Sequence, residues 1–209
     1  MEYKFQILDI SQDDVKVDYE SNYKQYVVTL YGKTDTNKTI ICNVLGFEPY
    51  FYIKIPKSWN SLYAKTTFLN NIDKNYKSVI NTSKLKKKNS IKQYKDLYGY
   101  NVDENDQIKK FSFLKLHFHN YTSFNKFIRN VKEYYKKNVN STSKTIKQWI
   151  DCNIDECDSC LYESNIPPII KFIHDKSIEP SGWVKVINFK EPILKNFKCE
   201  IEIEVLEKN

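Results

Sequence analysis

Three cysteines in a polar stretch are the first candidates for chemistry in this sequence. Cys152, Cys157 and Cys160 follow the spacing Cys-x4-Cys-x2-Cys, and His174 or Cys199 could complete a tetrahedral zinc site. Zinc modules usually supply a second Cys-x2-Cys or Cys-x2-His pair, and the sequence has none. We therefore predict reduced cysteines and no metal site.

Acidic residues offer two further candidate sites. Asp155 and Glu156 are adjacent in a polar segment, so they lack the alternate spacing that places two carboxylates on one face of a strand. Glu200, Glu202 and Glu204 alternate with apolar residues, which predicts a strand with one solvent-facing polar side. Neither set is predicted to be catalytic.

A lysine cluster is the first candidate nucleic-acid-binding feature. It consists of Lys84, Lys86, Lys87 and Lys88, and Lys92 and Lys95 follow shortly after it. Lysines attract phosphates and release counterions on binding, so the run could follow a phosphate backbone. It could also be a nuclear-import patch or only a solvated loop.

Two phenylalanines are the second such candidate. Phe111 and Phe113 lie in KKFSFLKLHF (109–118), which half-matches the RNA-recognition signature whose alternate aromatics stack on bases. In the alternative interpretation, both rings are buried against another sheet. His117 lies on the same face and is predicted to be a polar surface residue. The opposite face is predicted to pack on helices: Leu114, Leu116 and Phe118.

The composition is that of a folded, basic protein. Of the 209 residues 41% are hydrophobic, and 33 basic against 26 acidic groups give a formal net charge of +7. This predicts one ordinary domain or two small ones and favours polyanionic partners. Arg129 is the only arginine, so the chain has few groups for bidentate recognition of phosphates. Without a charge-free stretch long enough to span a membrane, we expect a soluble, intracellular protein with no membrane partner.

The apolar pattern predicts an α+β protein. Strands are expected where apolar residues run or alternate, and helices where they recur at helical spacing. The expected strands are 3–10, 25–31, 39–45, 50–55, 111–118, 183–187 and 199–205. The expected helices are 58–75, a second through 124–135 capped by Thr122 or Ser123, and a short one that begins at Pro167 and Pro168.

Three segments resemble the N-terminal region of family B replicative DNA polymerases, in their delta-type and large-DNA-virus branches. They are GFEPYFYIKIP (46–56), LYESNIPPIIKFIHDKSIEPSGWVKV (161–186) and the closing CEIEIEV (199–205). The family has an arginine where this sequence has Lys171. The resemblance covers nearly the whole chain.

The residues of the family's catalytic sites are missing. Its proofreading site begins with an Asp-x-Glu pair on a strand, and its polymerase aspartates lie in Ser-Leu-Tyr-Pro-Ser and Tyr-Gly-Asp-Thr-Asp-Ser contexts. None of these occurs in this sequence. The resemblance therefore implies a section truncated before the first exonuclease motif, with no catalytic residue and no cofactor of its own. The Mg²⁺ of the two-metal sites belongs to the missing catalytic domains.

The resemblance also implies an architecture. We expect antiparallel β hairpins that form a barrel-like sheet, with an RRM-like (ferredoxin-like) α/β insert. Residues 1–45 would form a β-hairpin subdomain and residues 46–140 the RRM-like subdomain. Residues 141–209 would pack toward the exonuclease domain, whose core is absent.

The function implied is that of a non-catalytic N-terminal part of a DNA-directed DNA polymerase in replication, one that binds single-stranded template beside the 3'-5' exonuclease domain. Expected partners are DNA and the exonuclease and polymerase domains of the same or a split polymerase, in the nucleus or a viral replication compartment. The competing hypothesis is a free-standing RRM-like module that binds single-stranded nucleic acid such as RNA. The segment 161–186 favours the polymerase, because an RRM does not need it.

Overall fold

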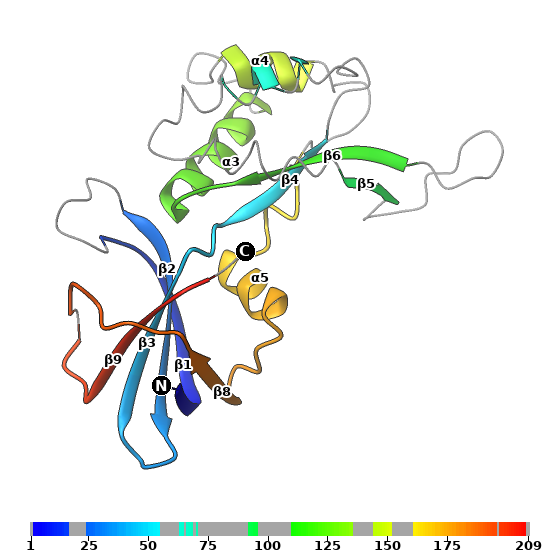
Figure 1. Cartoon of the computed structure of the whole chain (residues 1–209). Coiled ribbons are helices and arrows are strands. Elements are labelled where there is room, and N and C mark those ends of the chain that lie inside the picture. The colour runs from blue at the N-terminus through cyan, green and yellow to red at the C-terminus, as the bar shows by residue number, and fades with distance from the viewer. Residues whose placement is uncertain are drawn as a thin grey trace. The chain divides into compact units, whose positions relative to one another are not determined.

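The structure is a computed structural model, and it forms two compact units (Figure 1). It describes residues 2–16, 24–54, parts of 63–70, 92–95, 110–135, 144–151, 161–195 and 197–207. The first unit combines residues 1–49, 119–122 and 166–209, and the second combines residues 50–118 and 123–165. Each unit is therefore built from segments that are far apart in the sequence. Within the described residues, no helix is both long and apolar enough to cross a membrane.

The first unit contains a curled five-stranded sheet of order β8-β1-β2-β3-β9. Its strands are β1 (Glu2–Val15), β2 (Gln25–Thr34), β3 (Thr39–Leu45), β8 (Trp183–Ile187) and β9 (Ile201–Leu206). Strands β8, β1, β2 and β3 pair antiparallel, which confirms the predicted hairpin of β2 and β3. Strand β9 pairs parallel with β3, an arrangement that the sequence pattern did not predict.

One face of this sheet carries the core of the first unit. Phe5 and Ile7 of β1 are fully buried there. The sheet can close tightly because Gly32 of β2 lies opposite Ile7, and a Cβ atom at Gly32 would approach Phe5 to 2.4 Å. Helix α5 (Pro168–Asp175) packs on this core through Phe172, whose ring centroid lies 5.3 Å from that of Phe47.

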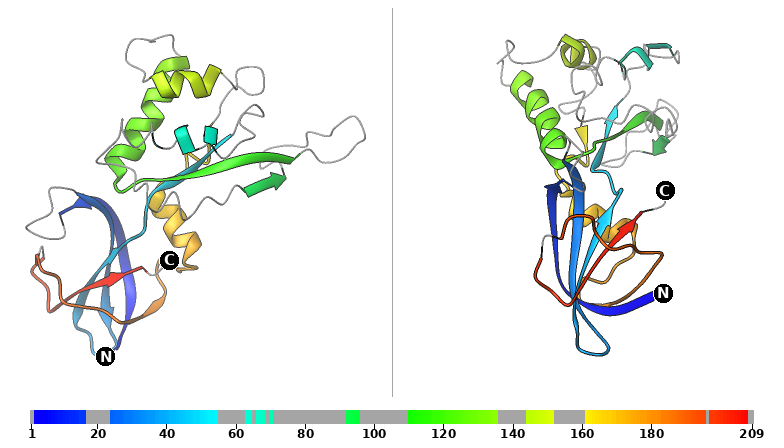
Figure 2. Two further views of the ribbon diagram at one scale, coloured as in Figure 1. Left: turned by 45° about the horizontal axis from the view of Figure 1, so that its top comes forward. Right: turned by 60° about the vertical axis from the view of Figure 1, so that its left-hand side comes forward.

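The chain between β8 and β9 crosses the opposite face of the sheet (Figure 2). Phe197 of this crossing segment packs edge-on against Tyr31 of β2, with ring centroids 5.7 Å apart. The Lys190 ammonium forms an ion pair with the Glu204 carboxylate of β9 at 3.2 Å. The backbones of the same two residues form an isolated antiparallel β-bridge. As a result, consecutive residues of β2 are buried on both faces of the sheet.

The second unit contains a four-stranded antiparallel sheet of order β5-β6-β4-β7. Its strands are β4 (Tyr50–Lys54), β5 (Lys92–Lys95), β6 (Lys110–His117) and β7 (Leu161–Tyr162). Its helices are α3 (Tyr121–Tyr135), the first two residues of which belong to the first unit, and α4 (Lys144–Asp151). Residues 63–64, 66–68 and 70, which lie within the expected helix 58–75, are helical.

Aromatic side chains fill the space between this sheet and its helices. The Phe51 ring of β4 lies 5.1 Å from Phe118 and 5.3 and 5.5 Å from Phe124 and Phe127 of α3. The helix-facing side predicted for β6 is thereby confirmed. Helix α4, which the sequence pattern did not predict, adds the fully buried Trp149 to this core.

The N-terminus of α3 differs from the predicted one. The helix starts at Tyr121, and its first N–H groups are bound by the Asp14 carboxylate, at 2.6 Å from Tyr121 and 2.8 Å from Thr122. The prediction of Thr122 or Ser123 as the cap was therefore wrong. A carboxylate that is distant in the sequence accepts hydrogen bonds from these N–H groups of the first turn. Its negative charge also interacts favourably with the positive end of the helix dipole.

Candidate functional site

The structure describes few of the residues predicted to bind nucleic acid. Lys84, Lys86, Lys87 and Lys88 lie outside the described residues, and so does the side chain of Phe111. Their role stays a prediction.

Phe113 is described, and it belongs to the core. Its side chain is 1% exposed, and its ring meets Tyr162 of β7 in a T-shaped contact with centroids 4.7 Å apart. A ring that stacks on a base must be accessible, so the prediction of an exposed Phe113 was wrong. The alternative interpretation, burial in the fold, holds for this residue.

The same correction applies to His117, which was expected at the surface. It is 6% exposed, and its ring lies 5.6 Å from that of Tyr50 on the neighbouring strand. The Lys115 ammonium lies 3.5 Å from the centroid of the same tyrosine ring. Tyr50, Lys115 and His117 thus form a packed cluster, not an open aromatic platform.

Most residues of the candidate metal and acidic clusters lie in a part of the chain that the structure does not describe. Cys152, Cys157 and Cys160 lie outside the described residues, as do Asp155 and Glu156. The described portions of the chain contain no group of three His, Cys, Asp or Glu side chains placed to hold a metal ion.

The acidic row of β9 is not the solvent-facing side that was predicted. Glu202 is 8% exposed and Glu204 is 4% exposed, beneath the crossing segment. Glu200 alone lies at the surface, where its carboxylate accepts hydrogen bonds from the Thr39 N–H at 2.6 Å and hydroxyl at 2.9 Å. These bonds lower the pKa of the Glu200 carboxyl.

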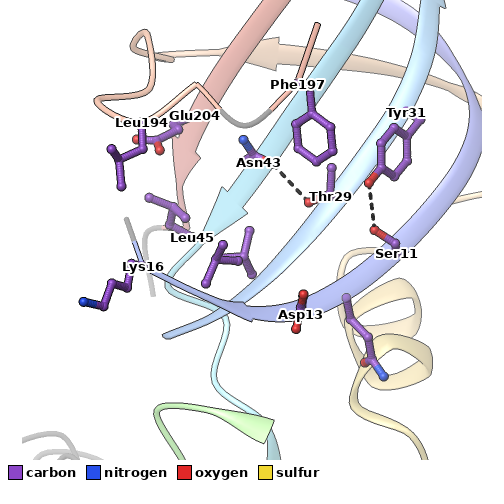
Figure 3. A pocket seen from close by; sticks show the side chains of 13 residues that line it. Ser11, Asp13, Lys16, Thr29, Tyr31, Asn43, Leu45, Leu194, Phe197 and Glu204 are labelled. Carbon is purple, nitrogen blue, oxygen red and sulfur yellow. Dashed lines mark hydrogen bonds between the residues drawn. The ribbon is translucent and has the colours of Figure 1, made fainter. Parts of the chain in front are cut away.

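A pocket of about 360 Å³ lies on this face of the first unit, between the sheet and the crossing segment (Figure 3). Strands β1, β2, β3 and β9 supply its floor and walls, and the crossing segment closes one side. The labelled lining residues are Ser11, Asp13, Lys16, Thr29, Tyr31, Asn43, Leu45, Leu194, Phe197 and Glu204.

Hydrogen bonds between strands hold the polar side chains of this pocket. The Thr29 hydroxyl donates to Asn43 Oδ1 at 3.0 Å, and the Asn43 amide donates to Glu202 Oε1 at 3.3 Å. Ser11 and Tyr31 share a further hydrogen bond of 3.1 Å (Figure 3). This network keeps the walls in fixed positions, because each side chain is restrained by a neighbouring strand.

The pocket combines apolar walls with oxygen acceptors. Val27, Leu45 and Phe197 offer apolar contact, whereas Asp13 and Glu204 supply carboxylate oxygens. Its described lining contains neither histidine nor cysteine. The sequence signal that could have found it is the presence of Thr29 and Asn43 inside strongly apolar strands.

The chain is similar in sequence to DNA polymerases of viruses and of an insect, although no family model matches the sequence. The DNA polymerase of Phaeocystis pouchetii virus is 30% identical over 168 residues, which are 78% of this chain and 15% of the relative. That of Pyramimonas orientalis virus is 24% identical over 95% of this chain and 15% of its own length. The DNA polymerase delta catalytic subunit of Drosophila melanogaster is 24% identical over 86% of this chain and 16% of its own length.

A solved structure gives the same indication at the level of the fold. The family B DNA polymerase of the archaeon Pyrobaculum calidifontis superposes with a TM-score of 0.50 over 98% of this chain and 20% of its own. The sequences are 15% identical, so this likeness concerns the fold alone. The chain is homologous to a section of family B DNA polymerases.

Homology to these polymerases confirms the family inferred from the three sequence segments. This polymerase homologue spans about 15% of the length of the two viral relatives. The activity of the whole relatives is therefore a matter for proposal.

Proposed function

We propose that the chain is a non-catalytic N-terminal part of a DNA-directed DNA polymerase of family B that acts in DNA replication. The observation that carries this proposal is that relatives named DNA polymerase match 78–95% of the chain while the chain matches about 15% of them. It would work with the exonuclease and polymerase domains of the same or a split polymerase, in the nucleus or a viral replication compartment. Any Mg²⁺ would be held by those catalytic domains.

The second unit would serve as an RRM-like scaffold beside the 3'-5' exonuclease domain. Two features support this part of the proposal. Among the described residues of the unit, β4, β5, β6 and β7 are the first to fourth strands in chain order, and their spatial order corresponds to 2-3-1-4. A helical segment follows the first strand, and α3 follows the third, as a β-α-β-β-α-β unit requires.

The chain would also contact the single-stranded template. Its net charge of +7 favours a polyanion, and nearly all of that positive charge is carried by lysine. Lysine acts as a point charge without bidentate geometry, so binding would be weak, sequence-tolerant and steeply dependent on salt.

A free-standing RNA-binding module is not the favoured alternative. Such a module would correspond to the second unit alone, whereas the matches to polymerases extend over as much as 95% of the chain. The first unit, with its own five-stranded sheet and core, would have no role in it.

Two assays on the purified chain test the proposal. With a primed template and with single-stranded DNA, in magnesium or manganese, we expect neither extension nor degradation. Metal-dependent turnover that disappears in Asp155→Asn or Glu156→Gln variants would overturn it. In fluorescence anisotropy, an unstructured oligodeoxynucleotide should bind more tightly than a duplex of equal length. Absence of any binding at low salt would remove the template-contact part.

A further inference from the structure

An exposed aromatic side chain lies at one edge of the first unit. Strand β8 is the end strand of the five-stranded sheet and lies beside β1 (Figure 1). Its first residue, Trp183, is 51% exposed, and Ile187 at its end is 55% exposed. Burial of a large aromatic ring is strongly favourable, so the exposed Trp183 ring offers apolar area to a partner at this edge.

The backbone around Trp183 holds it in place. Gly182 N–H donates to Glu179 O at 2.9 Å, which closes a turn, and Gly182 O accepts from Ile7 N–H at 2.9 Å. A Cβ atom at Gly182 would lie 2.7 Å from Glu179 Cβ, so only glycine allows this close approach. Trp183 therefore starts β8 from a defined position, although its side chain faces solvent.

Three lysines share the face of the sheet on which Trp183 lies. Trp183 pairs with Gln6 of β1, which pairs with Lys33 of β2, and paired residues share a face. Lys4 Nζ lies 5.6 Å from the Trp183 ring centroid. We call Lys4, Lys33, Trp183 and Lys185 the β8 edge surface. Lys185 pairs with Glu2 at 2.6 Å, and the charge of Lys33 acts on the Glu200 carboxylate. Three lysines thus face two carboxylates, and the surface keeps a small net positive charge.

We propose that the β8 edge surface is a site for single-stranded nucleic acid, with one base stacked on Trp183 and the adjoining phosphates near Lys4 and Lys33. This inference rests on the proposed template contact and gives it a location that the buried Phe113 cannot provide. The charge of the surface selects a polyanion, and the aromatic ring selects a strand whose bases are free to stack. A neutral apolar peptide would not supply Lys4 with a counter-charge.

The test measures binding of fluorescein-labelled oligothymidylate to the full chain by anisotropy, over a series of salt concentrations. Trp183→Ala should weaken binding about 5- to 150-fold at every salt concentration, as expected for the loss of one stacked base. Tyr63→Ala is the matched control, because Tyr63 is an aromatic residue that is 80% exposed in the second unit. It should leave the affinity unchanged.

The charges are tested separately. The Lys4→Gln/Lys33→Gln variant should reduce the slope of log K against log salt by about 1 to 1.5. Lys144→Gln/Lys147→Gln removes the same charge from α4 and should change the slope less. Tryptophan fluorescence provides a direct readout, because oligothymidylate should quench the wild-type emission. This quenching should be lost in Trp183→Phe, in which Trp59 and the fully buried Trp149 remain. Circular dichroism verifies that all variants are folded.

Each outcome has a distinct meaning. If the wild-type chain binds no oligonucleotide, the proposed template contact fails, and the site fails with it. If the wild type binds but Trp183→Ala behaves like Tyr63→Ala, the template contact stands and the β8 edge surface is wrong. If an acidic peptide displaces the oligonucleotide, restores the Trp183 emission and binds more tightly than the oligonucleotide does, the surface is a protein-docking site and the proposal is overturned.

Discussion

Replacing Phe113 by alanine separates a role in folding from a role in binding. The ring is 1% exposed and packs against Tyr162 at 4.7 Å, in the same unit as the aromatic core around Phe51. Because the ring is buried in these contacts, Phe113→Ala should destabilise the second unit. It should not weaken nucleic-acid binding when measured where the variant is still folded.

The expected loss of stability follows from this burial. Full burial of a phenylalanine contributes about 1.5–3 kcal/mol of transfer free energy, and the T-shaped pair adds about 0.5–1.5 kcal/mol. The residual cavity brings the usual total for such truncations to about 3–5 kcal/mol. A double-mutant cycle with Tyr162→Ala isolates the pair, and its coupling energy should be about 0.5–1.5 kcal/mol.

Urea unfolding followed by circular dichroism measures these quantities. Tyr63→Ala is the control, because its ring is 80% exposed in the same unit and its loss should change stability by less than about 0.5 kcal/mol. A Phe113→Ala variant that is as stable as this control but has lost affinity for oligothymidylate would refute the burial argument and restore Phe113 as a stacking residue.

Three further predictions concern the first unit. Asn43→Ala removes the amide that links the strands to Glu202, and it should lower the unfolding free energy by about 1–3 kcal/mol in urea titrations; an unchanged midpoint would show that the link is dispensable. Burial raises the pKa of the Cys42 thiol to about 12. In a variant whose other four cysteines are replaced by serine, Cys42 should therefore react with Ellman's reagent at pH 8 only after unfolding, and rapid reaction in the folded variant would contradict its burial. The hydrogen bonds from Thr39 lower the pKa of the Glu200 carboxyl in the folded chain. The stability contributed by the Glu200 carboxylate is therefore present above the ordinary glutamate pKa, and it is lost as the pH falls through the lowered pKa of the folded chain. An NMR titration should show that low pKa, and Thr39→Val should raise it; equal pKa values in both proteins would show that the Thr39 hydroxyl has no part in the shift.

Local patterns in the sequence predicted many of the elements. The run at 25–31, the polar turn and the run at 39–45 became β2 and β3, because alternating apolar side chains and a short connection specify a hairpin without distant contacts. The apolar side of β6 was also predicted correctly. This side of β6 packs on α3, which follows β6 directly along the chain, so the packing is also a local feature.

Local patterns could not predict the elements that depend on distant partners. Helix α4 is short, and its Trp149 is buried by contacts with Phe68 and Phe127, which come from other parts of the chain. The N-terminus of α3 is bound by Asp14, more than a hundred residues earlier. Neither partner can be identified from spacing alone.

The sequence by itself determined the family resemblance, the strand-forming segments and which of their residues share a face, because alternation is a property of the local backbone. Only the tertiary structure decided whether each face is covered. The crossing segment between β8 and β9 buries Glu202 and Glu204, which alternation alone would place in solvent, and Tyr162 covers Phe113. The end position of β8 in the sheet leaves Trp183 exposed. Burial is set by chain segments that meet in space, so the surface available for binding emerged from the fold and not from the periodicity of any one strand.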